Sequence, residues 1–356
     1  MSSTATPIAY DPAVVGNLDD DDNDSFADDS SLRESTASLT SSIFESRTIF
    51  GRSYQSSKTT EYWAPKDEKH INGLDIAHQM LFHMLDDKLF QAPIRDDPQY
   101  ILDVGTGTGI WAIDVADEYP SAEVIGTDIS AVQPGWVPPN CIFQIDDAQQ
   151  PWTFKENHFD FVHARMLYGG IDDWPRLYQQ AFTHLKPGGW FQSIEPDIET
   201  LSENPRILAD NDHVFKQWCQ LFWQAGDKTG RTFRFARDGQ MEKAMKDAGF
   251  VDIVHKQWKA PIGGWAVDRK LKLIGQYNGA FIDESLDGFA IFPVGQILGW
   301  TFEEVHTLVA KMREAFADKK TLPYYTMHMV YGRKPGGPED SSTKPSESET
   351  KKPASP

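Results

Sequence analysis

The stretch Tyr100–Ala112, which reads YILDVGTGTGIWA, decides the fold of this chain. Its first five residues predict a buried strand, the glycines at 105, 107 and 109 predict a sharp turn, and Ile110 begins a helical pattern. Alternating glycines let the backbone bend and let a ligand lie against it without a Cβ clash. A strand, a glycine turn and a helix form the opening unit of a parallel α/β sheet, whose ligands bind beyond the carboxyl ends of the strands.

Strand and helix patterns alternate on both sides of this unit. Further strands are predicted at 124–128, 142–145, 159–162 and 190–194, and helices at 74–85, 110–118 and 174–184. The segment Lys186–Gly189, KPGG, is predicted to be a turn before the last of these strands. The alternation implies right-handed βαβ crossovers and a mainly parallel sheet that is covered by helices on both faces.

The second half of the chain adds elements that a minimal sheet does not need. Helices are predicted at 204–226 and 264–290, and a third begins at the capping box of Thr301 and Glu304. Strands at 250–254 and 327–331 are predicted to pair as an antiparallel hairpin that finishes the sheet. We expect insertions at 197–236 and 264–300 to form an aromatic lid over the carboxyl ends of the strands. Trp223 and Phe281 are the lid residues expected to face a methyl acceptor.

Composition limits the classes of function. The chain has 356 residues, 40% of them apolar, and its 34 basic and 53 acidic residues give a net charge of −19. Such a surface repels phosphate backbones and anionic membranes, so we expect no direct nucleic-acid partner and no membrane partner. Two cysteines, Cys141 and Cys219, are too few for a disulfide framework, which suits a reducing compartment. The expected location is the cytoplasm, the nucleus or both.

The two ends of the chain differ from the middle. Residues 1–45 are rich in Asp, Ser and Thr, and 335–356 in Pro, Ser, Lys and Glu. Neither segment has enough apolar surface to offset the entropy lost on ordering, so both are predicted to be disordered tails. The catalytic domain is expected to span 46–334.

The glycine loop is compatible with two cofactors. Gly107, Gly109 and Ala112 satisfy the dinucleotide pattern G-x-G-x-x-G/A, and Asp128 follows Gly107 by 21 residues, as a ribose-binding acid would. A nicotinamide dinucleotide therefore remains an alternative on the glycines alone.

Three features favour S-adenosylmethionine and methyl transfer over hydride transfer. The Asp103 carboxylate, just before the loop, would repel pyrophosphate but suits a cationic amino acid and sulfonium. The third strand ends in Asp146-Asp147-Ala148, where an acceptor for an adenine amino group is expected. No second nucleotide-binding half follows the fifth strand. Asp128 is predicted to accept hydrogen bonds from both ribose hydroxyls.

Several motifs that cofactor binding does not require identify a family. QPGWVPPNC at 133–141, HARM at 163–166 and DWPRL at 173–177, with the glycine loop, resemble the fungal LaeA-like class I S-adenosylmethionine-dependent methyltransferases. The resemblance covers residues 51–334 and departs from relatives at 54–58 and 72–75. It implies a Rossmann-like, seven-stranded sheet, mostly parallel with an antiparallel last strand, plus helical lid insertions.

The resemblance also implies site residues. It places Asp103, Gly105, Thr106, Gly107 and Gly109 around the methionine part of the cofactor, Asp128 and Ile129 at the ribose, Asp147 and Ala148 at the adenine, and Arg165 beside the methyl group. His163, Glu195 and Asp197 are candidate bases, but no catalytic residue is assigned. No metal is expected, because His78 and His83 are five residues apart and do not share a helix face.

Two functions follow from the resemblance. The first is methyl transfer to a small molecule of fungal secondary metabolism. The second is a LaeA-like regulatory subunit of a nuclear velvet-type complex that controls secondary metabolism. Histone methylation is a further alternative that no motif supports.

Overall fold

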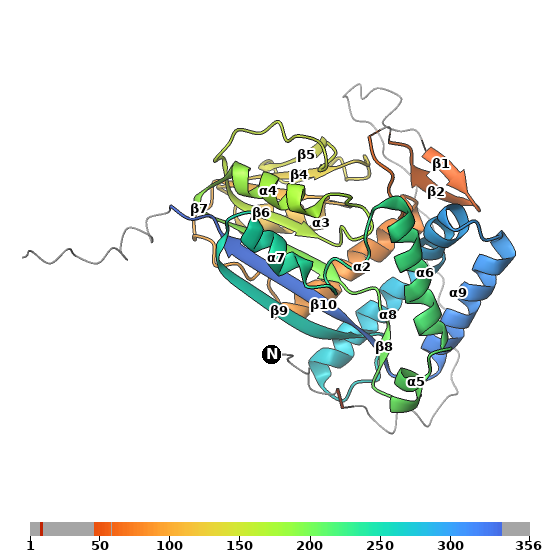
Figure 1. Cartoon of the computed structure of the whole chain (residues 1–356). Helices are drawn as coiled ribbons and strands as arrows, with labels where there is room; N and C mark the ends of the chain where they lie inside the picture. Colours follow the sequence, from red (N-terminus) through yellow and green to blue (C-terminus); the bar gives the residue numbers. More distant parts are fainter. Residues whose placement is uncertain (1–7, 10–45, 58, 337–356) are drawn as a thin grey trace, which may run out of the picture.

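A computed structural model describes residues 8–9, 46–57 and 59–336 (Figure 1). The rest of the predicted tails, 1–7, 10–45 and 337–356, lies outside the described residues. The centre of the molecule is a sheet in the strand order β5-β4-β3-β6-β7-β10-β8, with β9 paired to β10. The strands of this sheet are β3 (Tyr100–Val104), β4 (Glu123–Asp128), β5 (Cys141–Ile145), β6 (Phe159–Arg165), β7 (Leu185–Pro196), β8 (Leu201–Ser202), β9 (Val251–Pro261) and β10 (Pro323–Arg333).

The sheet is parallel from β5 to β7 and antiparallel beyond it. Asp103 of β3 lies opposite Gly126 of β4 and His163 of β6, in parallel register. Val330 of β10 lies between Ser193 of β7 and His255 of β9, antiparallel to both. These registers confirm the mostly parallel sheet with an antiparallel end. The sheet also has an eighth strand that was not predicted, the two-residue β8.

Two local predictions need correction. The strands β9 and β10 pair as predicted, but residues 262–322 with their helices join them, so they are not a hairpin. The predicted turn at Lys186–Gly189 lies inside β7, where Gly188 has a φ of +84° and the register with β6 shifts. Because glycine adopts positive φ without strain, the segment forms an irregularity within a long strand rather than its boundary.

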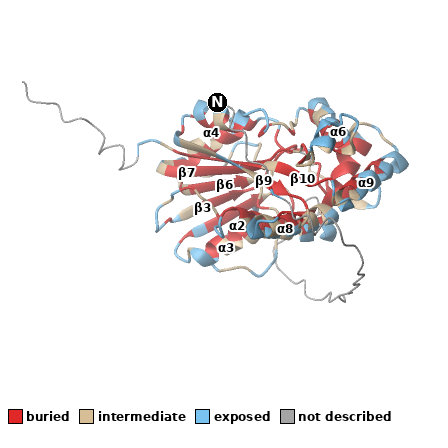
Figure 2. Ribbon diagram, turned by 90° about the horizontal axis from the view of Figure 1, so that it is seen from below, coloured by how far each residue is buried: buried red, intermediate tan, exposed pale blue. Residues whose placement is uncertain are grey.

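Helices cover both faces of the sheet (Figure 2). Helices α2, α3 and α8 pack on one face around Trp111, Met80 and Met327. Helices α4 and α7 pack on the other around Tyr178 and Met245. The helices are α2 (Glu68–Met84), α3 (Ile110–Glu118), α4 (Trp174–His184), α5 (Pro205–Ala209), α6 (Val214–Thr229), α7 (Gln240–Asp247), α8 (Arg269–Ala290), the π-helical η1 (Ile291–Ile297) and α9 (Phe302–Ala317).

A separate helical layer stands beside the β10 end of the sheet. Its apolar cluster joins α6, η1, α9 and the end of α8, and includes the fully buried Phe222. The predicted helix at 204–226 is two helices. In the turn after α5 the Asp210 carboxylate accepts from the N–H of Asp212, and at the start of α6 the His213 side chain accepts from the N–H of Phe215. The capping box of Thr301 and Glu304 is confirmed at the start of α9.

Part of the N-terminal segment packs on this end of the molecule. The Ile8 side chain is only 7% exposed and contacts a cluster that contains Trp265 and Tyr324. Its N–H donates to Glu203 Oε1 at 3.0 Å, and the Ala9 carbonyl accepts from the N–H of Val267 at 2.9 Å. At these two residues the chain departs from the predicted disordered tail, since a single buried isoleucine is enough to anchor a short segment.

The strands β1 (Ser46–Ile49) and β2 (Arg52–Gln55) form an antiparallel pair outside the main sheet. The chain then runs in extended form to α2. Within the described residues, no helix is long and apolar enough to cross a membrane.

Candidate active site

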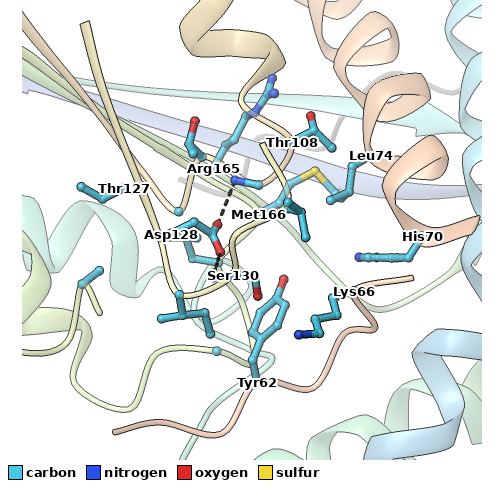
Figure 3. Close-up of a pocket in the computed structure, with 18 of the residues that line it drawn as sticks. Tyr62, Lys66, His70, Leu74, Thr108, Thr127, Asp128, Ser130, Arg165 and Met166 are labelled. Atoms are coloured by element: carbon cyan, nitrogen blue, oxygen red, sulfur yellow. Dashed lines mark hydrogen bonds between the residues drawn. The ribbon is translucent and has the colours of Figure 1, made fainter. Parts of the chain in front are cut away.

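A cavity opens at the carboxyl ends of β3, β4 and β6, where the sheet topology predicts a ligand site. Figure 3 shows side chains pointing into it from the sheet and from the segment before α2. Its lining includes eight of the ten predicted cofactor residues: Gly105, Thr106, Gly107, Asp128, Ile129, Asp147, Ala148 and Arg165. The other two, Asp103 and Gly109, are not among the lining residues.

The glycine loop has the backbone geometry that only glycine adopts without strain. Gly105, Gly107 and Gly109 have φ values of +68°, +59° and +82°. A Cβ on Gly109 would lie 2.3 Å from the Phe143 ring, so this glycine allows β5 to pack closely and does not need to face the ligand. The N–H of Thr106 donates to the carbonyl of Thr127, which fixes the loop against β4.

Asp128 ends β4 at the edge of the cavity. One carboxylate oxygen accepts from the N–H of Gly107 and the other from the N–H of Ser130, both at 2.9 Å (Figure 3). Loss of hydration raises the pKa of Asp128 to about 6, although these two donors oppose the rise. Each oxygen keeps a lone pair, so the carboxylate can accept two further hydrogen bonds from vicinal hydroxyls of a ligand.

Asp147 provides an acceptor without a partner. Its Oδ1 accepts from the N–H of Gln149 at 3.0 Å, whereas its buried Oδ2 has no hydrogen-bond partner among the described residues. A buried acceptor left unsatisfied costs about 1 to 3 kcal/mol, which a ligand N–H at this position would recover. The predicted adenine amino group is such a donor, so the residues present fit the predicted ligand here.

Asp103 supports the loop from behind. One oxygen accepts from the hydroxyl of Thr106 at 2.6 Å and the other lies 2.8 Å from Nδ1 of His163. The Trp111 ring stacks on the His163 ring with centroids 3.8 Å apart. Burial lowers the pKa of His163, so the neutral imidazole donates from Nδ1 to Asp103. Both oxygens of Asp103 thus have partners within the protein, and Asp103 is not among the lining residues of the cavity, so its contact with the cofactor stays a prediction.

Arg165 ends β6 and brings a half-buried cation to the cavity. Its Nη1 donates to Nδ1 of His78 at 3.1 Å, and Nε2 of His78 lies 2.9 Å from the Asp114 carboxylate. Burial lowers the pKa of His78, so this histidine is neutral and relays between the two charges. Among the described residues no carboxylate lies within 4.0 Å of the guanidinium, so its remaining donors can bind a ligand carboxylate. In the sequence analysis His78 was considered only as a possible metal ligand, and that role was rejected.

The extended segment before α2 closes the cavity opposite the sheet. Tyr62 and Lys66 point into it, with the Tyr62 ring directed toward Ser130 (Figure 3). Asp67 caps α2 by accepting from the N–H of His70 and forms a 2.6 Å ion pair with Arg52, which fixes the approach of this segment. Sequence reasoning missed these residues, because an extended stretch without periodicity gives no signal of which side chains face a ligand.

The three candidate bases have different environments. His163 and Glu195 are fully buried, and Glu195 accepts from the N–H groups of Leu167 and Tyr168 at 3.1 and 2.9 Å, so it braces the loop after β6. Burial raises the pKa of Glu195 to about 8. Of the three, only Asp197 lines a cavity. Within the described residues, no group of His, Cys, Asp and Glu could hold a metal ion.

A second, more apolar cavity adjoins the first under the helical layer. Met166, which follows β6 and has a φ of +55°, lines both cavities. Of the two predicted lid aromatics, Phe281 lines the second cavity, whereas Trp223 does not and instead stacks under the Arg237 guanidinium at 4.9 Å. Among the described residues, Met166 is therefore the one that lines both of these cavities.

Comparisons with known proteins agree with this geometry. The methyltransferase domain family matches residues 54–255. The methyltransferase pytC of Aspergillus terreus is 33% identical over 302 residues, which cover 85% of this chain and 92% of that protein. The secondary metabolism regulator LAE1 of Cochliobolus heterostrophus is 35% identical, over 80% of this chain and 94% of its own length.

The protein-methionine methyltransferase laeA of Emericella nidulans is 31% identical over 80% of this chain and 75% of its own length. A solved phosphoethanolamine N-methyltransferase 2 of Haemonchus contortus with S-adenosyl-L-methionine is 18% identical, with a TM-score of 0.42 over 72% of this chain and 52% of that one. The family match and the curated relatives decide between the two cofactors that the glycine loop allowed. The chain belongs to the methyltransferase domain family, and S-adenosyl-L-methionine is its methyl donor.

Proposed function

We propose that this protein transfers a methyl group from S-adenosyl-L-methionine to a small molecule of fungal secondary metabolism. The observation that carries the proposal is the second cavity, which meets the donor cavity at Met166 and is lined largely by apolar side chains of the helical layer. A mostly apolar lining suits a small molecule better than a flexible peptide, whose backbone needs hydrogen-bond partners. The pytC relative, named a methyltransferase, supports the catalytic assignment.

The polar side chains of the first cavity fit the donor in a single orientation. Asp128 binds the ribose hydroxyls, Oδ2 of Asp147 accepts from the adenine amino group, and the guanidinium of Arg165 binds the carboxylate of the methionine part. The methionine part then lies nearest to Met166, so the sulfonium methyl group points toward the second cavity. Positioning of donor and acceptor in this way supplies much of the acceleration of a displacement, on the order of 7 kcal/mol or more.

Calorimetry on the full chain tests the donor assignment. We expect S-adenosylmethionine and S-adenosylhomocysteine to bind and NAD not to bind. Arg165→Leu is expected to weaken S-adenosylhomocysteine binding by about 1.5 to 3 kcal/mol, the value of a hydrogen bond to a charged group. Methylthioadenosine, which lacks the amino-acid part, is the matched ligand whose affinity should stay unchanged. Equal losses for both ligands would show that Arg165 supports the loop and does not bind the carboxylate.

Product formation tests the acceptor class. Release of S-adenosylhomocysteine should depend on an added small-molecule extract from a deletion strain. Intact mass of the protein after incubation is the control for transfer to its own side chains, since the Emericella nidulans relative is named for methionine methylation. Methylation of the protein alone, with no dependence on extract, would contradict the small-molecule proposal.

A regulatory role is the second candidate, with one observation in its favour. Trp136, in the loop between β4 and β5, is 95% exposed, and Ile142 on the edge strand β5 is also exposed nearby in sequence. Exposed tryptophans frequently anchor protein interfaces. A velvet-type partner would fit the relatives named secondary metabolism regulators. A location in the nucleus, the cytoplasm or both remains our expectation from the sequence.

A pull-down from a fungal extract compares the full chain with Trp136→Ala. Loss of a velvet-type protein with unchanged S-adenosylhomocysteine affinity would support the regulatory role. Identical captured proteins from both baits would remove the surface argument and leave the catalytic proposal unaffected.

A further inference from the structure

The second cavity has a chemistry of its own. We propose that it binds the methyl acceptor and that this acceptor is an uncharged, largely apolar ring compound whose hydroxyl oxygen takes the methyl group. The inference rests on the proposed methyltransferase function and adds the class of acceptor. The cavity is formed where the loop after β7, helices α6, α8 and α9, and strand β10 meet.

The cavity lies next to the place where the methyl group is presented. Met166 lines both cavities, and its N–H donates to the carbonyl of Ile194 at 2.8 Å, so its backbone is fixed to the end of β7. A φ of +55° is uncommon for methionine and persists only where the surroundings enforce it. The side chain packs against the apolar clusters on both sides of the site. The two cavities thus meet at this one side chain, which has to move aside for the acceptor oxygen to reach the methyl carbon.

The walls of the cavity favour a flat, apolar ligand. Trp218 comes from α6, Phe281 and Phe289 from α8, and Phe316 from α9, and all four line the cavity. Aromatic side chains on several sides favour contact with a flat, apolar ligand. These four residues lie far apart in the sequence, so the cavity exists only in the folded helical layer.

The charges around the cavity disfavour an anionic ligand. No Lys, Arg or His is among its lining residues in the described chain, and its one carboxyl group belongs to Asp197. Asp197 accepts from the N–H of Glu199 at 3.0 Å and from Arg237 at 3.1 Å, and Arg237 also pairs with Glu199, which in turn binds Lys216. Burial raises the pKa of Asp197 to about 6, so this carboxyl is charged near neutral pH and repels a second carboxylate.

The polar groups in the lining suit a hydroxyl. The hydroxyl of Tyr168 makes no hydrogen bond to any described residue, although the side chain is buried and lines the cavity. The hydroxyl of Tyr325 donates to Oδ1 of Asn278 at 2.9 Å and keeps its lone pairs for a donor. One phenol that can donate and one that can accept are the two partners that a ligand hydroxyl needs.

The transfer step balances without a further reactant. The bond between the methyl carbon and sulfur breaks, a bond between that carbon and the acceptor oxygen forms, and the electron pair of the broken bond stays on sulfur. The hydroxyl proton passes to solvent water at the open side of the cavity. A phenolic or enolic hydroxyl is acidic enough to need little help from a base, which agrees with the burial of His163 and Glu195 away from both cavities.

Matched ligands test the acceptor class. Naphthol and naphthoate share the same rings and differ in charge, and their binding to the full chain saturated with S-adenosylhomocysteine is measured by calorimetry near pH 7.5. We expect naphthol to bind and naphthoate to bind at least about tenfold more weakly. Comparable binding of both ligands, or binding of neither, would overturn the inference. Failure of S-adenosylhomocysteine itself to bind would instead contradict the methyltransferase function.

Variants locate the site. Phe281→Ala should weaken naphthol binding about tenfold and leave S-adenosylhomocysteine affinity unchanged. Phe302→Ala, an exposed phenylalanine of α9 outside the cavity, is the control and should change neither. Asp197→Asn is a second variant, for the case that Phe281→Ala misfolds, because it preserves the size of the side chain. It removes the negative charge from the cavity lining and should strengthen naphthoate binding several-fold. Unchanged discrimination in Asp197→Asn, or equal losses in both phenylalanine variants, would show that the acceptor binds elsewhere.

Discussion

The side chains predicted to bind the donor are positioned by backbone N–H groups of the glycine loop and its neighbours. The helical layer beside the loop is instead held together by side chains from segments that are distant in the sequence. At the donor end, Asp128 is positioned by the N–H groups of Gly107 and Ser130. In the layer, the Trp63 ring packs against three phenylalanine rings. The distances between ring centroids are 5.3 to 6.1 Å, for Phe222, Phe233 and Phe289. The first arrangement tolerates changes in the surrounding core, and the second does not. Donor binding and acceptor binding should therefore respond separately to mutation.

The largest expected effect is a loss of stability in the helical layer that leaves donor binding at the glycine loop unchanged. Phe222→Ala removes a fully buried ring and should lower the free energy of unfolding by about 3 to 5 kcal/mol. The affinity of the folded fraction for S-adenosylhomocysteine should stay within about twofold, because no contact of Asp128 is altered. Denaturant unfolding and calorimetry measure the two quantities. Leu208→Ala, at an exposed position of α5, is the control with an expected change under about 0.5 kcal/mol.

At the donor end we expect the reverse, a loss of donor affinity without a loss of folding. Asp128→Ala removes two acceptors for ribose hydroxyls and should weaken S-adenosylhomocysteine binding by about 2 to 3 kcal/mol. Asp128→Asn retains one acceptor oxygen and should lose less. A thermal melt checks that the fold remains intact. Unchanged affinity in Asp128→Ala would mean that the carboxylate serves only to fix the loop through Gly107 and Ser130.

A smaller effect depends on pH. Because burial raises the pKa of Asp128 to about 6, the carboxyl is largely protonated at pH 5 and loses its capacity to accept from two hydroxyls. Affinity for S-adenosylhomocysteine should fall about tenfold between pH 7.5 and pH 5, since one pH unit below the pKa leaves roughly a tenth of the groups ionised. The Asp128→Asn variant should show no such dependence, which separates this group from Asp197 and Glu195.

Asp128 also makes the free energy of unfolding depend on pH, with a sign opposite to its effect on donor affinity. The folded-state pKa of Asp128 lies above its unfolded value, so its contribution to stability is most favourable below the unfolded pKa and is lost as the pH rises through about 6. Asp128→Asn should therefore reduce the loss of stability between pH 4 and pH 6. An identical pH profile in the variant would contradict the raised pKa.

The smallest effect is expected at the N-terminal anchor. Burying the Ile8 side chain against Trp265 and Tyr324 is worth about 1.5 to 3 kcal/mol, but ordering the segment offsets much of this value. Ile8→Ala should lower the free energy of unfolding by about 1 kcal/mol and leave donor affinity unchanged. A stability equal to that of the parent protein would return residues 8–9 to the disordered tail that the sequence predicts.

Much of the donor end could be predicted because its signals are local. The spacing of three glycines, the strand before them and the acids at the ends of β4 and β5 follow from side-chain periodicity and from the rule that ligands bind at the carboxyl ends of parallel strands. Eight of the ten predicted residues line the cavity. Their contacts with the donor remain predictions, which the variants above test.

The contacts that sequence reasoning did not predict have a common physical cause. Asp103 has the correct position in sequence, but whether its carboxylate faces the ligand or the protein depends on His163, a residue on the neighbouring strand. The role of His78 depends in the same way on Arg165, 87 residues later. Hydrogen bonds between elements distant in sequence leave no periodic signal in either element, so they are visible only once the strands and helices are assembled.

The sequence by itself determined the parallel sheet, the glycine loop and the acids at the ends of β4 and β5, since these depend on residues close together in the chain and on the regular geometry of strands. Only the tertiary structure decided which lid aromatics face a ligand. Phe281 and Trp223 are both aromatic residues of the predicted lid, yet Phe281 lines the second cavity and Trp223 stacks under Arg237. The reason is that the rotation of each helix about its axis is set by packing against α9, β10 and the segment at Trp63, and no local pattern records it.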